Sequence, residues 1–442
     1  MRIFTSYSVR IRHYNAILEP TLAHYRDAVD FYIDVIDREW QSFSDLEHPN
    51  DAKGIAEAFT IPTKGHPAVK YDFTKRQYKF PSYYRRAAIA KAFGLVSSWR
   101  SQLKRWELSD PESRGKRPGR PCAGNSFPAL YRKGSFLMTG TYTARIKTWI
   151  RNTWDWLDVE LKKGDVDYIL RRCAGRKELC PSLVKHGKRW ALAFSFEERA
   201  KLCDTDIPEQ IVLAVDLGIN SAATCSAMLS DGTVLGREFL SLPGEEDSLK
   251  HAVGKICRAQ KHGARRMPRL WAKARGLSSR IAVLTAQFIV DMAIKYNADV
   301  IVFEHLDASG KKCGSKKQRL HMWRCQYVQA MVADKAHRLH MHVSHVCAWN
   351  TSRLAYDGSG RASRGKEAGF TSYSICRFPS GKIYNCDLGA SYNIGARYFI
   401  REIVKSLPET AWLAARAKVP ELARRSTCTL SSLIRLNAAL AA

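Results

Sequence analysis

The sequence predicts an α/β protein built from more than one domain. Its 442 residues exceed the length at which a single hydrophobic core stops growing. Hydrophobic residues make up 45% of the chain, which is ordinary for a folded protein. From residue 207 onward, apolar strand-like runs alternate with helical patterns, and this alternation is typical of an α/β domain.

The first 206 residues divide into a helical and a β-rich part. Residues 16 to about 45 place large apolar side chains at helical spacing, which predicts a long amphipathic helix. A turn-rich stretch follows, and "FPSYYRRAAIAKAFGLVSSWRSQLKRWEL" returns to a basic helical pattern. Between about 125 and 205, short runs such as "GSFLMTGTYTARI" and "KRWALAFSFEE" predict strands.

The region after residue 207 begins with a three-strand meander, in which Asp231-Gly232 marks the turn between the second and third strands. A basic run then leads into a helix that begins near Ser278 or Ser279, as a cap, and ends near Asn297. Next come a buried strand in "ADVIVFEHLD", a helix around 323–339 and a strand in "MHVSHVCAW".

Three acidic residues occupy special places in this pattern. Asp216 and Glu304 each end an apolar strand, and Asp387 precedes the small-residue segment "GASYNIGA". Each of them, taken alone, is an ordinary strand-end or turn residue. The order of strand, meander, helix, strand and a later helix opening with an acid is, however, the plan of an RNase H-like fold, in which these carboxylates meet.

Three converging carboxylates repel one another unless cations lie between them. Hard oxygen ligands with open coordination positions favour Mg²⁺ or Mn²⁺. Two such ions, about 4 Å apart, activate water and stabilise the leaving oxygen of a phosphodiester. The sequence therefore predicts metal-dependent phosphodiester hydrolysis with Asp216, Glu304 and Asp387 as catalytic metal ligands.

The motifs around these acids resemble the RuvC nuclease segments of the TnpB family of transposon-associated proteins and of compact type V CRISPR effectors. "AVDLGIN", "VFEHLD" and "DLGASYNI" match the three RuvC motifs in order. The acids are 88 and 83 residues apart, and "TSR" at 351–353 lies between the last two. The likeness covers residues 207–400, and Gly389 stands where the family usually has Asn.

The resemblance implies a domain arrangement. Residues 1–15 and 110–206 would form a β-barrel, wedge-like module split by a helical recognition module at 16–109. Residues 207–346 and 387–442 would form the RuvC-like nuclease domain, and 347–386 an insert that binds target nucleic acid. Proteins of this family use a guide RNA to select a DNA target next to a short adjacent motif.

The charge of the chain predicts a polyanionic partner. There are 71 Lys and Arg against 42 Asp and Glu, a net charge of +29. Guide RNA and target DNA are therefore favoured over a membrane surface, because the basic residues are spread among aromatics. The candidate contacts are Arg85, Arg86, Arg100, Lys104, Arg105, Arg258, Lys261, Arg265, Arg266, Arg269, Trp271, Lys273 and Arg275. A further basic loop contains Lys311, Lys312, Lys316, Lys317 and Arg319.

The cysteines predict no structural zinc. None of the 12 has CxxC spacing, and Ala355 and Gly358 stand where the family's zinc ribbon would have its first pair. Around His345 and Cys347, a histidine-rich strand is open to a metal site or, more simply, to local hydrogen bonding. Reduced thiols and the lack of a secretory leader or an apolar span favour the cytoplasm.

Three functions fit these observations. The first is an RNA-guided DNA endonuclease with one RuvC-like site. The second is a guided DNA-binding repressor that does not cut, which the presence of all three acids disfavours. The third is a protein-only, structure-selective nuclease, for which the long basic front half has no obvious use. The oligomeric state is open.

Overall fold

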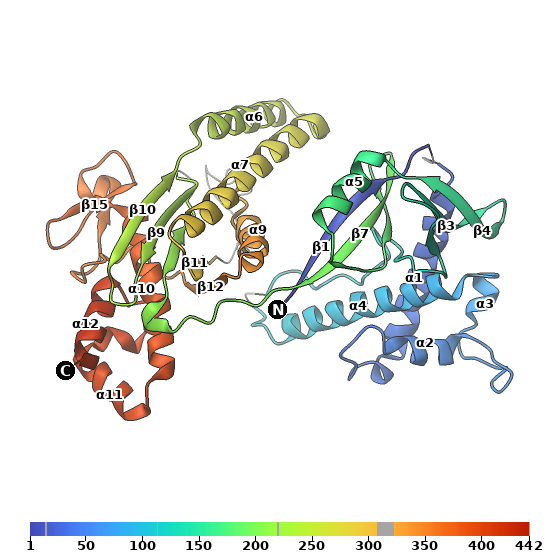
Figure 1. Ribbon diagram of the computed structural model, residues 1–442, viewed down its shortest axis with the longest axis horizontal. Coiled ribbons are helices and arrows are strands. Elements are labelled where there is room, and N and C mark those ends of the chain that lie inside the picture. The colour runs from blue at the N-terminus through green and yellow to red at the C-terminus, as the bar shows by residue number, and fades with distance from the viewer. Residues whose placement is uncertain (14–15, 113, 219–220, 307–321, 442) are drawn as a thin grey trace. The chain divides into compact units, whose positions relative to one another are not determined.

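The computed structural model describes residues 1–13, 16–112, 114–218, 221–306 and 322–441 (Figure 1). The chain divides into two compact units, residues 2–198 and residues 199–442 with Met1. Helices and several β-sheets occur together, so the prediction of a mixed α/β protein is confirmed. The unit boundary lies eight residues before the predicted start of the nuclease domain at residue 207.

The unit formed by residues 2–198 has one hydrophobic core. Helix α1 (Glu19–Arg38) packs against α4 (Ser82–Glu107), and its buried residues include Leu22, Tyr25 and Val29. The predicted amphipathic helix is confirmed, although it ends at Arg38 instead of near residue 45. Side chains from both predicted front modules belong to the same hydrophobic cluster, so these modules share a core.

Two sheets complete this unit. Strand β7 is hydrogen-bonded to β1, β5 and β6, and β2, β3 and β4 form an antiparallel meander. The remaining elements of the unit are β1 (Arg2–Arg10), η1 (Trp40–Ser42), α2 (Ala52–Thr60), α3 (Phe73–Arg76), β2 (Phe136–Met138), β3 (Thr143–Ile150), β4 (Thr153–Glu160), α5 (Lys163–Arg172), β5 (Lys177–Glu178), β6 (Ser182–His186) and β7 (Arg189–Arg199).

The second unit is built on a five-stranded sheet with the order β10-β9-β8-β11-β12. The strands are β8 (Val212–Asp216), β9 (Ala223–Met228), β10 (Val234–Leu240), β11 (Val300–His305) and β12 (His342–Cys347). β8, β9 and β10 pair antiparallel, whereas β11 pairs parallel with both β8 and β12. The meander and its turn are confirmed, because Gly232 has a φ of +96° and the amide of Leu229 donates to Thr233.

Helices cover both faces of this sheet. Val212, Ala214 and Val302 pack in one hydrophobic cluster with α10 (Cys386–Ser406) and α12 (Leu430–Ala441). Leu213 and Val215, on the opposite face, pack with α7 (Pro268–Lys295) and α9 (Cys325–Arg338). The two-residue alternation of side chains along each strand produces this division. η2 (Ile207–Glu209), α11 (Glu409–Lys418) and η4 (Pro420–Ala423) complete the part of the unit that surrounds this sheet.

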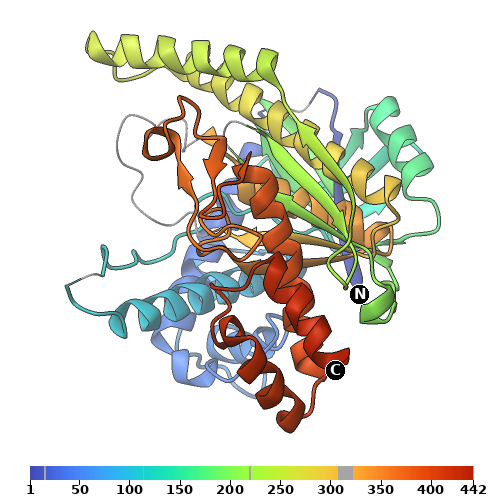
Figure 2. The same cartoon turned by 90° about the vertical axis from the view of Figure 1, so that its left-hand side faces the viewer.

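Helix α7 begins ten residues earlier than the sequence pattern predicts. It starts at Pro268, so Ser278 and Ser279 lie inside it, and the side chain of Ser278 donates to the carbonyl of Met322 at 2.6 Å. The prediction of a serine cap is therefore wrong, because α6 (Pro243–Lys261) packs against the early turns of α7 and supports them. Figure 2 shows this α6–α7 hairpin extending beyond the sheet.

Among the described residues, α7 is the one helix long and apolar enough to span a membrane by length and composition. Its buried residues, which include Ala286, Ile289 and Val290, lie against the sheet. This packing is that of a core helix.

Residues 347–386 hold a small sheet of their own. Strands β13 (Ser363–Arg364), β14 (Ile375–Arg377) and β15 (Ile383–Asn385) pair antiparallel, with η3 (Gly365–Ala368) after β13. Where a zinc ribbon would have its cysteines, the side chains of Ala355, Ala362 and Phe378 form an apolar cluster with Cys376 and Cys386.

Close packing between α10 and the sheet yields a stability prediction. A Cβ at Gly395 would lie 2.6 Å from Met228 Sδ and 3.2 Å from Ala214 Cβ, whereas at Gly389 the nearest atom is 3.7 Å away. We expect Gly395→Ala to lower the free energy of unfolding by about 1–3 kcal/mol through overpacking. Gly389→Ala, in the same helix, should raise it by about 0.5 kcal/mol. Urea unfolding measures both, and equal stabilities would contradict the packing argument.

Candidate active site

Asp216 and Glu304 lie side by side at the ends of two parallel strands. Phe303 on β11 pairs with Val215 on β8, so the next residues along the strands, Glu304 and Asp216, stand next to each other. Because side chains alternate along a strand and Ala214 and Val302 face the α10 layer, Asp216 and Glu304 lie on the side of α10.

Asp387 is brought to the same place by α10. It is the second residue of that helix, and the helix packs on β8 and β9. The side chain of Asn385 caps the helix by accepting a hydrogen bond from the amide of Leu388 at 3.0 Å. A carboxylate in the first turn of a helix is stabilised by the helix dipole, and the Ser221 hydroxyl also donates to Asp387.

The electrostatics of the three acids shows that they are near one another. Burial raises the pKa of Asp216 well above its usual range, and the charges of Glu304 and Asp387 raise it further, against the opposing effect of Arg364. Burial also raises the pKa of Glu304 and of Asp387. The structure thus brings together three residues from distant parts of the sequence, with Asp216 facing both of the others.

The donor set suits hydrated Mg²⁺ or Mn²⁺. Within the described part of the chain, no three His, Cys, Asp or Glu side chains stand close enough to hold one ion together. Mg²⁺ is usually held by one or two carboxylates and several waters. Thr224, which pairs with Asp216 across β8 and β9, has a buried hydroxyl without a hydrogen-bond partner among the described residues, and the water shell of such an ion would satisfy it.

Asp216→Asn is expected to stabilise the cation-free protein, with a melting temperature a few degrees higher at pH 8. The folded pKa of Asp216 lies above the unfolded value, so the unfolded state binds fewer protons between the two values. Stability therefore falls as pH rises above about 4, and asparagine removes this loss. Calorimetry in a chelator at pH 5 and pH 8 should show a larger gain at pH 8.

The matched control for this measurement is Asp204→Asn, since the side chain of Asp204 is exposed. We expect no change in its melting temperature. A variant at Asp216 that melts at or below the wild-type temperature would contradict the raised pKa.

Two neighbours of the acids were missed by the motif analysis. The hydroxyl of Thr351 donates to the Glu304 carboxylate, although the sequence identified "TSR" only as part of a resemblance. Arg364, which donates to the Ser352 hydroxyl at 3.0 Å, partly offsets the rise that burial causes in the pKa of Asp216 and of Asp387. No sequence signal distinguishes Arg364 from the other basic residues of the insert.

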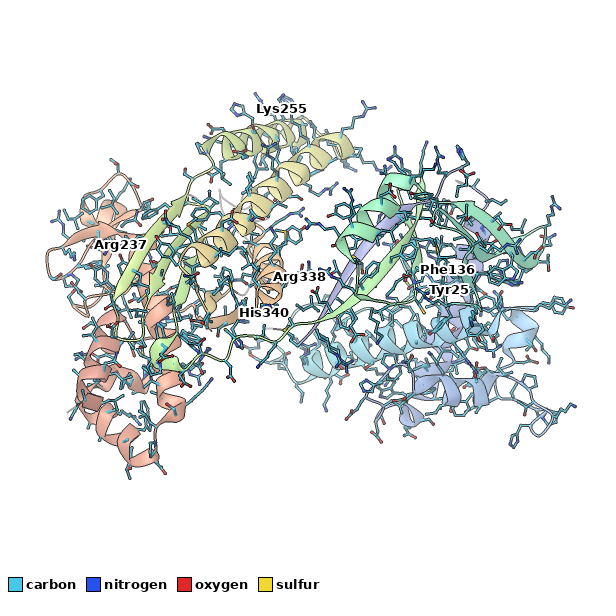
Figure 3. The ribbon with its side chains drawn as sticks, in the orientation of Figure 1. Tyr25, Phe136, Arg237, Lys255, Arg338 and His340 are labelled. Atoms are coloured by element: carbon cyan, nitrogen blue, oxygen red, sulfur yellow. The ribbon has the colours of Figure 1, made fainter. Side chains whose placement is uncertain are left out.

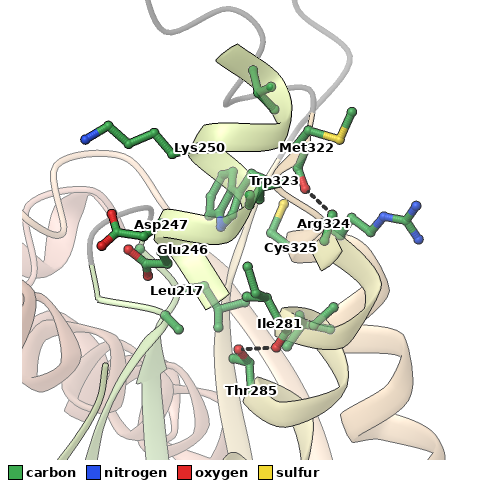
Figure 4. Close-up of a pocket in the computed structure, with 17 residues that line it drawn as sticks. Leu217, Glu246, Asp247, Lys250, Ile281, Thr285, Met322, Trp323, Arg324 and Cys325 are labelled. Carbon is green, nitrogen blue, oxygen red and sulfur yellow. Dashed lines mark hydrogen bonds between the residues drawn. The ribbon is translucent and has the colours of Figure 1, made fainter. Parts of the chain in front are cut away.

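A pocket of about 410 Å³ lies on the α7 side of the sheet, opposite the face that carries the acids. Leu217, which follows Asp216, forms one wall, and Ile281 and Trp323 lie across from it (Figure 4). Glu246 and Asp247 line the pocket together with Lys250 and Arg324, so the formal charges of its lining balance.

The α6–α7 hairpin carries a dense row of cations. Seven of the predicted nucleic-acid contacts are exposed, and none makes an ion pair with another described residue; we call these seven the hairpin strip. The hairpin strip consists of Arg258, Lys261, Arg265, Arg266, Arg269, Lys273 and Arg275. Lys255 lies on the side of α6 away from α7 (Figure 3). Trp271 is half-buried and packs with Ile256 inside the hairpin.

The predicted contacts on α4 are placed differently. Arg85 and Arg86 both pair with Glu57, and Arg100 pairs with Asp37. Lys104 and Arg105 are exposed near the end of the helix. The first three cations are therefore ion-paired within their own unit, although Arg85 and Arg86 share one carboxylate.

The other sequence candidates have structural partners or lie outside the description. His340 donates to the carbonyl of Lys201 at 2.6 Å and His342 to that of Cys203 at 2.9 Å, so these two rings are hydrogen-bonded to the main chain of a distant segment. The basic loop with Lys311, Lys312, Lys316, Lys317 and Arg319 falls outside the described residues.

Residues 5–150 match the model of the Aq_aa04 family. An uncharacterized protein, aq_aa04, of Aquifex aeolicus strain VF5 is 30% identical over 125 residues, which cover 26% of this chain and 70% of the relative. The chain therefore belongs to the Aq_aa04 family.

Comparison of folds finds guide-RNA-bound type V effectors. A Cas12f1-sgRNA-target DNA complex is 13% identical, with 89% of this chain and 98% of that chain covered and a TM-score of 0.35. CasPhi-2 (Cas12j) bound to crRNA is 10% identical, with 89% and 97% covered and a TM-score of 0.38. Because these TM-scores are below 0.5, the function is inferred from this chain's own residues.

Proposed function

We propose that this chain is an RNA-guided DNA endonuclease with a single RNase H-like, RuvC-type active site. The observation that carries the proposal is the convergence of Asp216, Glu304 and Asp387 beside one end of a sheet. The strand order β10-β9-β8-β11-β12, with three antiparallel strands followed by two parallel ones, supports an RNase H-like core. The three motifs that resemble TnpB and type V effectors support the RuvC assignment.

The proposal assigns a role to each part of the chain. Residues 207–346 and 387–442 form the nuclease domain, and the insert at 347–386 contacts target DNA. Residues 1–15 with 110–206 act as the wedge-like module and 16–109 as the recognition module, which together read the adjacent motif. The hairpin strip, whose seven cations make no ion pair with the described residues, is suited to the phosphate backbone of a guide–target duplex.

The acids act as ligands for two divalent cations, Mg²⁺ or Mn²⁺, which when bound supply an activated water and stabilise the leaving oxygen. Asp216 lies near both other carboxylates, so it would help to hold the cations together with Glu304 and Asp387. Thr351 orients Glu304, and the dipole of α10 stabilises Asp387. One site of this kind cuts the two DNA strands in succession.

The proposal is tested with protein purified from cells that carry its native locus. After a heparin step, RNA of defined length should copurify, and its sequence identifies the guide. The complex should cut a matching duplex in Mg²⁺, whereas a mismatched duplex should stay intact. Equal cutting after complete removal of RNA would overturn guidance and favour a protein-only nuclease, and tight guided binding without cutting would favour a repressor.

A further inference from the structure

We propose that Asn393 and Arg397 on α10 position Glu304 through Thr351, and thereby set the affinity of the acid cluster for divalent cations. This inference rests on the proposed function, because it assigns the acids to cation binding. It assigns a positioning role to two residues of α10 and to one loop threonine, none of which would bind the cation directly.

The contact with Glu304 is made by one hydroxyl. Thr351 is 2% exposed, and its Oγ1 lies within hydrogen-bonding distance of Glu304 Oε1 and 3.1 Å from the carbonyl oxygen of Ala348. A hydroxyl has one proton to donate. The carboxylate receives it, because a hydrogen bond to a charged acceptor is the stronger one. The bond fixes one carboxylate oxygen and leaves the other for a cation.

Thr351 can hold Glu304 only if its own loop is held. Asn393, which is fully buried, donates from Nδ2 to the carbonyl oxygens of Thr351 at 2.8 Å and Leu354 at 3.0 Å. Its Oδ1 accepts a hydrogen bond from the amide of Leu430 at 3.2 Å. Both Nδ2 hydrogens and Oδ1 thus take part in joining α10 to the loop and to the start of α12.

Arg397 holds the beginning of the same loop. It is 4% exposed, and its Nη1 donates to the carbonyl oxygens of Cys347 at 2.6 Å and Trp349 at 2.9 Å. Nε and Nη2 donate to Cys428 and Ser426. Burying a guanidinium without hydrogen-bond partners costs free energy. The main-chain carbonyls that Arg397 binds offset this cost, and Arg397 in turn fixes their positions.

The geometry makes α10 a common support for two of the acids. Asn393 and Arg397 are four residues apart and lie on one face of the helix, and the same helix carries Asp387 in its first turn. From the other side of the sheet, Gln329 of α9 donates to the main-chain oxygen of Glu304 at 3.0 Å. Both the backbone and the carboxylate of Glu304 are therefore fixed.

The first experiment measures Mn²⁺ binding to the guide-free protein by electron paramagnetic resonance of free Mn²⁺. Thr351→Val keeps the shape and removes the hydroxyl, and we expect it to weaken binding by about 10–100-fold, as is usual for partners of metal ligands. Thr351→Ser should restore binding to within about threefold. Thr285→Val is the matched control, since that buried hydroxyl donates to the carbonyl of Ile281, away from the acids.

The second experiment tests the connection to α10. Asn393→Ala should weaken Mn²⁺ binding, and the double variant with Thr351→Val should be no weaker than the worse single variant, because both changes act on one path. Calorimetry confirms that each variant is folded. Additive losses would overturn the path through Thr351, and wild-type binding by Thr351→Val would overturn the inference itself.

These results separate the inference from the proposed function. A wild-type protein that binds Mn²⁺ with the expected loss in Thr351→Val supports the inference, even if no guided cleavage is found. Guided cleavage by a wild type whose Thr351→Val variant binds Mn²⁺ equally well supports the function and overturns the inference.

Discussion

Guide-loaded Asp216→Ala protein is expected to cut matching DNA at least about 10³-fold more slowly than the wild type. Asp216 lies near both Glu304 and Asp387, so under the proposed function its loss removes one of the three carboxylates that would hold the cations. Target binding should stay within about twofold, because the side chain belongs to the acid cluster and not to the hairpin strip. Single-turnover cleavage and filter binding on one duplex measure the two quantities.

The control for this experiment is Asp204→Ala, which changes an exposed acid in the same unit. It should cut at the wild-type rate. If Asp216→Ala cuts normally, the assignment of the acids is wrong. If it loses binding and cutting in parallel, the site contributes to recognition instead of chemistry.

Replacing four cations of the hairpin strip by glutamine is expected to produce the second large effect. The four changes are Arg258→Gln, Arg265→Gln, Arg269→Gln and Lys273→Gln. Each lost phosphate contact reduces the slope of log affinity against log salt by about 0.7–0.9, so the slope for RNA should fall by roughly 3. Affinity at low salt should fall by at least about tenfold. Binding measured across a series of salt concentrations gives both numbers.

The contrasting variant combines Arg85→Gln, Arg86→Gln and Arg100→Gln on α4. These cations already pair with Glu57 and Asp37, so we expect lower stability of that unit and a salt slope within about 0.5 of the wild-type value. A similar fall in slope for both variants would show that ion pairing inside the protein does not keep an arginine from RNA.

Local patterns in the sequence were sufficient to predict the strands of the five-stranded sheet in the second unit. The apolar runs before Asp216 and Glu304 predicted β8 and β11, and Asp231-Gly232 predicted the turn of the meander. These features depend on residues close together in the chain. A buried strand appears in the sequence as a run of apolar residues, and a turn that needs a positive φ appears as a glycine. The positions of the three acids at element ends followed from the same patterns.

The first residue of a helix and the partner of a charged side chain could not be predicted from local sequence patterns. α7 begins at Pro268 because α6 packs against its first turns. The basic residues at the start of α7 do not by themselves predict this contact. Arg100 and Lys104 look alike in the sequence, yet only Arg100 meets an aspartate, Asp37 on α1. Whether a cation is free or paired depends on which side chain the fold brings opposite it.

The sequence by itself therefore determined the chemical character of this protein. The chain is basic, and it has three acids at the ends of apolar strands and at the start of a helix. The arrangement that makes those acids a site comes from the tertiary structure. Parallel pairing of β8 with β11 sets Asp216 beside Glu304, and α10 brings Asp387, Asn393 and Arg397 to the same place. The physical reason is that repulsion, desolvation and hydrogen bonding depend on distances of a few ångströms between groups that lie more than 80 residues apart in the chain.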